Sequence, residues 1–209
     1  FLSGREPETV SFSDLKTVVH GFSYHAREIK EPLYDGLTAP EDGDFHILLA
    51  HGGDEAHIPV DKKKFAASGF SYTALGHIHK PEILIPGKMA YPGSPEPLDK
   101  TETGVHGILA GEISPGSRKV TSLEFVPLCR CQYVPLAVNV SPATTNMELE
   151  MKIAQEIERR GRHHIYRFRI KGMRDPQMEF DTENLLSKFR IVEITDESEP
   201  QYDFSALFA

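Results

Sequence analysis

Two short apolar runs stand out in the first half of the chain, and each is followed by glycine. Residues 45–50 are almost continuously apolar and lead into Gly52-Gly53. Residues 70–75 repeat the pattern and end at Gly76. Apolar runs of this length, bounded by turn residues, are typical of strands buried on both faces of a sheet. The pattern therefore predicts two buried strands, each followed by a sharp turn.

A short helix is predicted between these two strands. Asp61 is placed to cap it, and the helix extends to Ser68 before Gly69 ends it. An earlier strand is predicted over residues 15–22, closed by Gly21. Strand, helix and strand joined by short connections predict a layered α/β domain. Further along, only strands and turns are predicted, over residues 89–91, 107–113 and 120–126.

The pattern changes near residues 127–134, where we place a domain boundary, so that residues 1–128 and 129–209 form two units. Thr145 and Glu148 have the spacing of a capping box and begin a helix that Gly161 ends. Leu149, Ile153 and Ile157 follow at helical spacing, and Met147 and Met151 beside them are expected to join the core. The other elements predicted here are strands over 134–140, 165–170 and 190–195 and a helix over 182–187. The second unit is therefore a small α/β domain.

Composition and charge narrow the class of protein. The 209 residues are 39% hydrophobic and 26% charged, which is ordinary for a globular chain. No apolar run approaches the ~18 residues of a membrane span. Cys129 and Cys131 are too few for a disulfide framework, so a reducing cytoplasmic compartment is expected. A net charge of −8 argues against non-specific coating of nucleic acid.

Histidines mark the ends of both buried strands. His51 closes the run over 45–50, and Gly76-His77-Ile78-His79 follows the run over 70–75. Imidazoles at the carboxyl edge of a sheet can converge on Zn, Mn, Fe or Ni. The alternative is that these are ordinary histidines, because the chain has 10 of them and two histidines two residues apart are common. On spacing alone the two interpretations are about equally weighted.

Three stretches give the chain a family resemblance: FHILLAHG at 45–52, GFSYTALGHIHKP at 69–81 and AYPGSPEP at 90–97. Together with VHGFS at 19–23 they resemble the calcineurin-like metallophosphoesterases, and most of all the SbcD-type DNA repair exonucleases with their YhaO-like bacterial branch. The resemblance covers residues 15–126 well and 134–209 more loosely. It implies a partial metallophosphoesterase β-sandwich with flanking helices, followed by a small α/β capping domain.

The resemblance also implies a metal site. In this family the histidine of the HG strand end and the first histidine of GHxH bind one metal, and the last histidine of GHxH binds the other. Here these are His51, His77 and His79, and the implied cofactors are two divalent ions, with Mn expected. The family's upstream motifs, D-x-H, G-D and G-N-H, do not occur in this sequence. We therefore expect the second half of a nuclease domain, which alone binds metal weakly and cleaves no DNA.

Other charged and polar residues receive more modest interpretations. Lys80 and Lys88 are candidate phosphate contacts, and a local excess of five positive charges surrounds Arg159, Arg160 and Arg162, which are candidate DNA-backbone contacts. A solvated helix face is the simpler interpretation of these arginines. Ser94 is interpreted as a turn residue. The histidines without a matching motif are expected to be structural or on the surface: His20, His25, His46 and His57.

The sequence leaves three functions open. The first is a metal-dependent DNA exonuclease that works on DNA with an SMC-like ATPase as partner, as the family resemblance implies. The second is a phosphoesterase with the same metal chemistry and a substrate other than DNA, because one fold supports many substrates. The third is a non-catalytic module that docks DNA or the ATPase. A homodimer is also left open.

Overall fold

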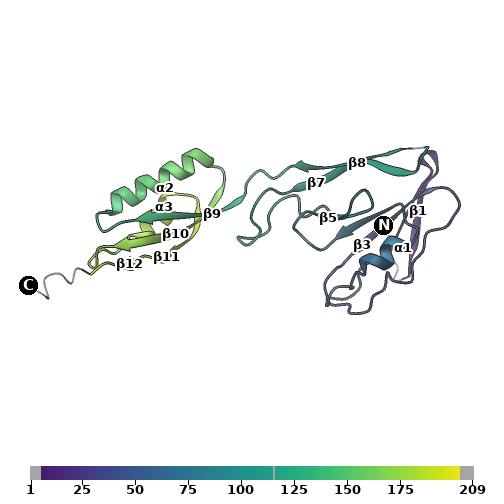
Figure 1. Ribbon diagram of the computed structural model, residues 1–209, viewed down its shortest axis with the longest axis horizontal. Helices are drawn as coiled ribbons and strands as arrows, with labels where there is room; N and C mark the ends of the chain where they lie inside the picture. The colour runs from purple at the N-terminus through teal and green to yellow at the C-terminus, as the bar shows by residue number, and fades with distance from the viewer. Residues whose placement is uncertain (1–5, 115, 203–209) are drawn as a thin grey trace, which may run out of the picture. The chain divides into compact units, whose positions relative to one another are not determined.

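The computed structural model describes residues 6–114 and 116–202, which divide into two compact units (Figure 1). The first unit contains the described residues up to Glu96 together with His106–Cys129, and the second contains Pro97–Val105 and the described residues from Arg130 onward. Both combine strands with few helices, so the predicted α/β class is confirmed. Within the described part of the chain, no helix has the length and apolar character needed to cross a membrane.

A six-stranded sheet with the order β1-β2-β3-β4-β6-β5 forms the centre of the first unit. The pairs β2–β3, β3–β4 and β4–β6 are parallel, whereas the two outer pairs are antiparallel. Strands β7 and β8 form a separate antiparallel hairpin. The elements are β1 (Glu8–Phe12), the 3-10 helix η1 (Ser13–Leu15), β2 (Thr17–Gly21), β3 (Phe45–His51), α1 (Lys62–Ala67), β4 (Tyr72–Gly76), β5 (Glu82–Ile85), β6 (Met89–Tyr91), β7 (Gly107–Ser114) and β8 (Lys119–Pro127).

One face of this sheet carries the core of the unit. Leu48 of β3 and Leu75 of β4 pack with Phe65 of α1, and all three are almost fully buried. The Asp61 carboxylate accepts hydrogen bonds from the backbone N–H groups of Lys63 and Lys64, which confirms the predicted cap. The short helix therefore begins where the sequence places it and covers the β3–β4 face.

The opposite face of the sheet is apolar and only partly covered. Leu49 of β3 is 50% exposed and Phe12 of β1 is 48% exposed. A cavity of about 780 Å³ lies on this side, lined mainly by apolar residues, and His51 is among its lining residues. The side chains of β3 therefore alternate between the closed core and an open face that leads to His51.

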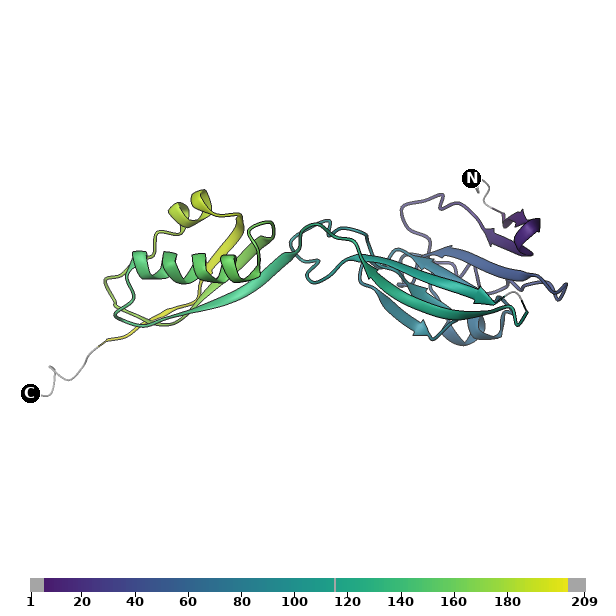
Figure 2. The ribbon, with the colours of Figure 1, turned by 90° about the horizontal axis from the view of Figure 1, so that it is seen from above.

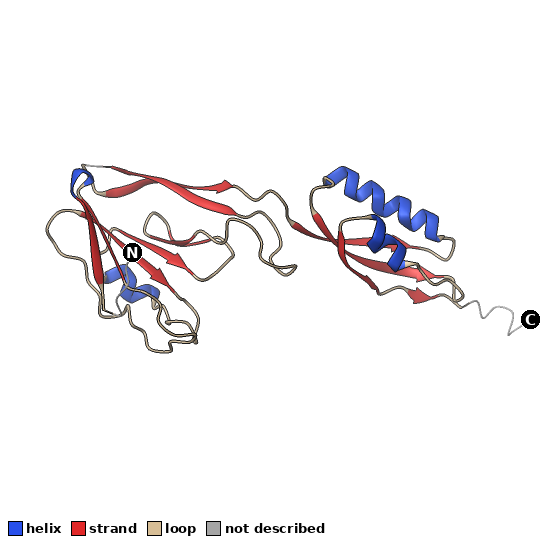
Figure 3. Cartoon of the chain, turned by 180° about the vertical axis from the view of Figure 1, so that it is seen from behind, coloured by secondary structure: helices blue, strands red, loops and turns tan. Residues whose placement is uncertain are grey.

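The second unit is a parallel sheet with its helices on one face (Figures 2 and 3). Strand β10 pairs in parallel with β9, β11 and β12. The elements are β9 (Tyr133–Val140), α2 (Asn146–Arg160), β10 (Ile165–Arg174), α3 (Thr182–Lys188), β11 (Ile191–Asp196) and β12 (Glu199–Pro200). Helix α2 begins at the predicted capping box of Thr145 and Glu148, and the backbone N–H of Gly161 closes it on the carbonyl of Ile157.

The expectation that Met147 and Met151 join the core is wrong. Met147 is 73% exposed and Met151 is 54% exposed, whereas Leu149, Ile153 and Ile157 are buried against the sheet. The buried residues repeat every four positions and form one stripe. A residue two positions away is rotated by about 200° around the helix axis, so both methionines lie on the opposite side.

Three strands, β1, β5 and the two-residue β12, were not predicted, and one was predicted too long. Strand β1 (Glu8–Phe12) is an exposed edge strand that mixes polar and apolar residues, and β5 (Glu82–Ile85) is four residues long. The predicted strand over 15–22 begins at Thr17, because residues 13–15 form η1 and Lys16 has a left-handed φ of 46°. Short edge strands carry little periodicity, which explains why the sequence pattern did not show them.

A chain of hydrogen bonds joins β2 to the start of β3. His20 Nε2 lies 2.8 Å from His46 Nδ1, and His46 Nε2 lies 2.8 Å from Asp42 Oδ1. His46 is only 3% exposed. Burial lowers the pKa of His20 from its ordinary 6.5, and the neighbouring His46 lowers it further. His20 is therefore held neutral in the folded state.

This arrangement predicts a loss of stability in mild acid. The pKa of His20 is lower in the folded than in the unfolded chain. The contribution of His20 to the free energy of unfolding is therefore fully present above about pH 6.5, and it is lost as the pH falls toward the folded pKa. The pKa values of His51 and His164 are lowered as well, so they act in the same direction. We expect the Tm to fall between pH 7 and pH 5, and to fall less in His20→Gln than in the control His25→Gln. A Tm that is constant or rises over this range would contradict the assignment.

Candidate metal centre

The ends of β3 and β4 bring two histidines together. The strands are parallel, and His51 is the register partner of Gly76. The loops that follow them therefore leave the same edge of the sheet. The rings of His51 and His77 have centroids 5.3 Å apart. His77 has a φ of 96°, a conformation that side chains with a Cβ rarely adopt and that is found preferentially at functional sites.

Two glycines allow the loop after His51 to fold closely against its surroundings. Gly52 has a φ of 152°, and an added Cβ would lie 2.3 Å from the carbonyl oxygen of His57. Gly53 has a φ of 136°, and an added Cβ would lie 1.9 Å from the hydroxyl oxygen of Tyr91. Only glycine fits both the backbone angle and the space at these two positions.

Two buried tyrosines fix the same loop. The Tyr91 hydroxyl donates to the carbonyl oxygen of Gly52 at 2.8 Å. The backbone N–H of His51 donates to the Tyr34 hydroxyl oxygen, also at 2.8 Å. Both tyrosines are less than 5% exposed. The backbone around His51 and Gly52 is therefore held from two sides.

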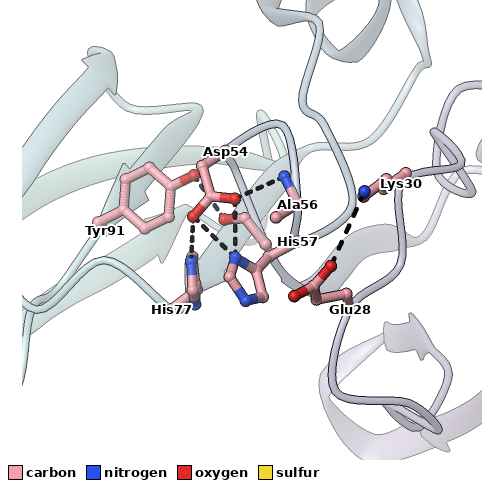
Figure 4. Close-up of polar contacts among 8 residues, drawn as sticks. Glu28, Lys30, Asp54, Ala56, His57, His77 and Tyr91 are labelled. Atoms are coloured by element: carbon pink, nitrogen blue, oxygen red, sulfur yellow. Dashed lines mark hydrogen bonds and ion pairs between the residues drawn. The ribbon is translucent and has the colours of Figure 1, made fainter.

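Asp54 lies between two histidine rings (Figure 4). Its Oδ2 is 2.7 Å from Nε2 of His77, and its Oδ1 is 2.7 Å from Nδ1 of His57. One ligand atom from each of Asp54, His57 and His77 lies within 4.8 Å of the others. The rings of His57 and His77 have centroids 4.4 Å apart. A carboxylate and two imidazoles thus meet at one point of the surface.

The electrostatics of the cluster suit a cation. Hydrogen bonds from His77 and then His57 hold the pKa of Asp54 far below its usual range, so this carboxylate is negatively charged. Burial lowers the pKa of His51, and the histidines at 77, 57 and 79 lower it further. A neutral imidazole and an ionised carboxylate are the forms that bind metal ions. Near neutral pH, the Asp54 carboxylate and the His51 imidazole need no change of charge to act as ligands.

The backbone of His79 lies against the Pro92-Gly93-Ser94 segment that follows β6. His79 is exposed, and its carbonyl oxygen accepts a hydrogen bond from the backbone N–H of Ser94 at 3.0 Å. A Cβ on Gly93 would lie 2.7 Å from that same carbonyl oxygen. The Ser94 hydroxyl is buried and lies 2.9 Å from His106 Nδ1. The Pro-Gly-Ser turn therefore supports the backbone at His79.

The sequence reasoning missed two residues of this cluster. No motif points to Asp54, and His57 was placed among the structural or surface residues. In the structure Asp54 contacts both rings, so that His57 lies beside the candidate site that His77 helps to form. The spacing H-G-G-D-x-x-H, from His51 to His57, is the signal that could have identified them.

The lysines and arginines that are candidate phosphate contacts differ in whether their charged groups already have partners. Lys80 is exposed and follows His79 directly. The Lys88 amino group donates to the carbonyl oxygen of Ala66 at 2.7 Å, so it is engaged in holding α1. The arginines at the end of α2 form ion pairs within their own helix segment: Arg159 and Arg160 with Glu156, and Arg162 with Glu158.

No protein-family model matches the chain, but individual proteins do. It is 33% identical over 133 residues to an uncharacterized metallophosphoesterase, YhaO of Bacillus subtilis, a match that covers 60% of this chain and 32% of that protein. It is 32% identical over 109 residues to the DNA double-strand break repair protein Mre11 of Methanocaldococcus jannaschii, covering 48% and 29%. It is 37% identical over 84 residues to the SbcD component of the nuclease SbcCD of Rhodobacter capsulatus, covering 38% and 19%.

These similarities support a relationship to the metallophosphoesterase and nuclease family, at modest identity and partial coverage. The matched part spans about a third or less of each relative's length. The names metallophosphoesterase and nuclease support a general hydrolase class, and a metallophosphoesterase uses divalent metal ions. The Asp and His residues at the ends of β3 and β4 fit such ions, because imidazole and carboxylate are their usual protein ligands.

The glycine at the centre of the loop provides a test of the local packing. Gly53→Ala introduces a Cβ onto the Tyr91 hydroxyl and forces a residue with a side chain into a conformation reserved for glycine. We expect it to lower the free energy of unfolding by about 1–3 kcal/mol. Gly36→Ala is the matched control, because nothing lies within 4 Å of its added Cβ, and we expect it to be nearly neutral. Equal losses of the free energy of unfolding in Gly53→Ala and Gly36→Ala, measured by denaturant unfolding, would contradict the described geometry.

Proposed function

We propose that the protein containing this chain is a metal-dependent phosphodiesterase that acts on DNA. The observation that carries the proposal is the placement of His51 and His77 at the carboxyl ends of two adjacent parallel strands, with ring centroids 5.3 Å apart. The similarity to Mre11 and to a component of the nuclease SbcCD supports DNA as the substrate. The first unit is then part of a nuclease domain, and the second is a capping domain.

In this proposal His51, His77 and His79 are metal ligands of a two-metal centre. Bound divalent ions, with manganese expected, supply Lewis acidity and a water molecule of lowered pKa next to the phosphodiester. Within this chain, Tyr91 and Tyr34 hold the loop that carries His51, and the Pro-Gly-Ser turn holds the backbone of His79. The remaining anionic ligands are proposed to come from residues outside these 209, because the matched relatives are much longer.

Contact with the DNA backbone is proposed to come mainly from Lys80. This side chain is exposed and adjacent to His79, so it can reach a phosphate that approaches the metal centre. Arg159, Arg160 and Arg162 are proposed as weaker contacts, since glutamates on their own helix segment already neutralise part of their charge. An SMC-like ATPase is the proposed partner of the whole protein.

The isolated chain is expected to be inactive. Without further anionic ligands, the charge of two metal ions is poorly compensated, and the family's upstream histidine, worth about 100-fold or more, is missing. We expect no Mn²⁺-dependent cleavage of duplex DNA above background by the 209-residue chain. Joining it to the preceding segment of its parent protein is expected to restore cleavage.

In that restored protein His77→Ala is expected to abolish cleavage, whereas His25→Ala, at an exposed position outside the site, is expected to retain it. DNA affinity should fall steeply with salt concentration. Robust cleavage by the isolated chain, lost in its His77→Ala variant, would show that the ligand assignment is wrong. Turnover of small phosphodiesters that is insensitive to salt, with no cleavage of DNA, would contradict DNA as the substrate.

A further inference from the structure

We propose that Asp54, His57 and His77 together bind one divalent transition-metal ion in this chain, with Zn²⁺ preferred over Mn²⁺. The inference rests on the proposed function in one respect, because His77 serves in both. It adds two ligands, Asp54 and His57, that none of the motifs in the sequence assigns. It also places a metal ion on this chain without any residue from outside it.

The three candidate ligand atoms lie within 4.8 Å of one another, close to the spacing of a coordination sphere. The two contacts of the Asp54 carboxylate, to Nε2 of His77 and to Nδ1 of His57, each measure 2.7 Å. In a tetrahedral site with bonds of about 2.0–2.1 Å, neighbouring ligand atoms lie about 3.3 Å apart. The groups must therefore separate by only roughly half an ångström to admit an ion between them.

The protons can be accounted for as well. An ionised carboxylate only accepts hydrogen bonds, so His77 holds a proton on Nε2 and His57 holds one on Nδ1 in the metal-free state. Binding of an ion at these two atoms requires the proton to leave each of them, and an imidazole can carry a proton on its other nitrogen instead.

The segment that carries Asp54 and His57 is held in place by backbone hydrogen bonds. The N–H of Gly53 donates to the carbonyl oxygen of His57 at 2.9 Å, and the N–H of Ile58 donates to that of Ile29 at 2.6 Å. The N–H of Ile29 in turn donates to the carbonyl oxygen of Ala56 at 2.9 Å. Ligands fixed in this way lose little conformational entropy on binding.

A local turn alone does not explain the arrangement. Asp54 Oδ1 accepts a hydrogen bond from the backbone N–H of Ala56 at 2.8 Å, which is ordinary turn geometry. The second oxygen, however, reaches His77, which is 23 residues away in the sequence and on a different loop. The carboxylate thus joins two loops and provides the negative charge that neutral imidazoles lack.

The ligand types determine the order of affinity among metal ions. Two imidazoles with one carboxylate and an open position suit Zn²⁺ and Co²⁺. Affinity at such a site generally rises from Mn²⁺ through Co²⁺ and is higher for Zn²⁺ than for Mn²⁺. We therefore expect the chain to bind Zn²⁺ more tightly than Mn²⁺.

Isothermal titration calorimetry of the 209-residue chain with Zn²⁺ and with Mn²⁺ tests the proposal. We expect one high-affinity Zn²⁺ per chain. Asp54→Asn and His57→Gln should each weaken Zn²⁺ binding by more than about 100-fold, because loss of even an outer-sphere partner of a metal ligand costs about 10–100-fold. The controls His25→Gln and His163→Gln remove exposed imidazoles elsewhere and should leave the affinity unchanged.

Circular dichroism of each variant monitors folding, and the two ligand variants are independent, so that one remains informative if the other does not fold. Zn²⁺ binding by both variants with the affinity of the unaltered chain would overturn the proposal. So would a loss of binding in His163→Gln instead.

If binding depends on His51 and His79 but not on Asp54 or His57, the inference fails and the proposed function stands. If Asp54 and His57 are required for binding but the restored full-length protein cleaves nothing, the proposed function fails and the inference stands.

Discussion

The parallel pairing of β3 with β4 is the constraint on which the candidate site depends. It sets His51 opposite Gly76, so that two loops leave the sheet at the same edge. A shift of register by one residue would turn the side chain of His51 to the other face of the sheet. The register is fixed by burial, because the alternate residues of β3, Leu48 and Ala50, pack in the core. The hydrophobic pattern of one strand thus determines where the imidazoles meet.

Around this edge, the loops are held in place by glycine and tyrosine residues and not by the candidate metal ligands themselves. The two glycines after His51 let the backbone pass close to Tyr91 and to the His57 carbonyl, where no Cβ fits. The Tyr91 hydroxyl then holds the loop by donating a hydrogen bond to the Gly52 carbonyl oxygen. Preorganisation of this kind keeps ligands near their bound geometry before an ion arrives, and it accounts for a non-glycine residue, His77, with a positive φ at this point.

The sequence predicted the elements whose signals are local. The buried run of β3, the Asp61 cap of α1 and the capping box of α2 all lie where the pattern placed them. It did not predict β1, because an exposed edge strand needs only a partner and not an apolar face. It also misjudged Met147, because apolar character alone does not say on which side of a helix a residue lies.

The candidate site was predictable only in part, because only some of its residues lie in elements with a local sequence signal. His51 and His77 could be identified from their positions after apolar strands, since parallel strands share an edge. Asp54 and His57 lie in a loop whose path depends on the backbone pairing of residues 56–58 with Ile29. Such pairing is a tertiary contact and leaves no periodic trace in the sequence. The contact by which the Asp54 carboxylate joins the two loops therefore became visible only in the structure.

The central claim is that the ends of β3 and β4 gather one metal-binding cluster. The most direct test is paramagnetic line broadening of the histidine ring signals in NMR spectra of the 209-residue chain, with Mn²⁺ added below one equivalent. We expect the signals of His51, His57 and His77 to broaden together and before those of His25, His163 and His164. Broadening that begins at His163 and His164, or that affects all histidines equally, would contradict it.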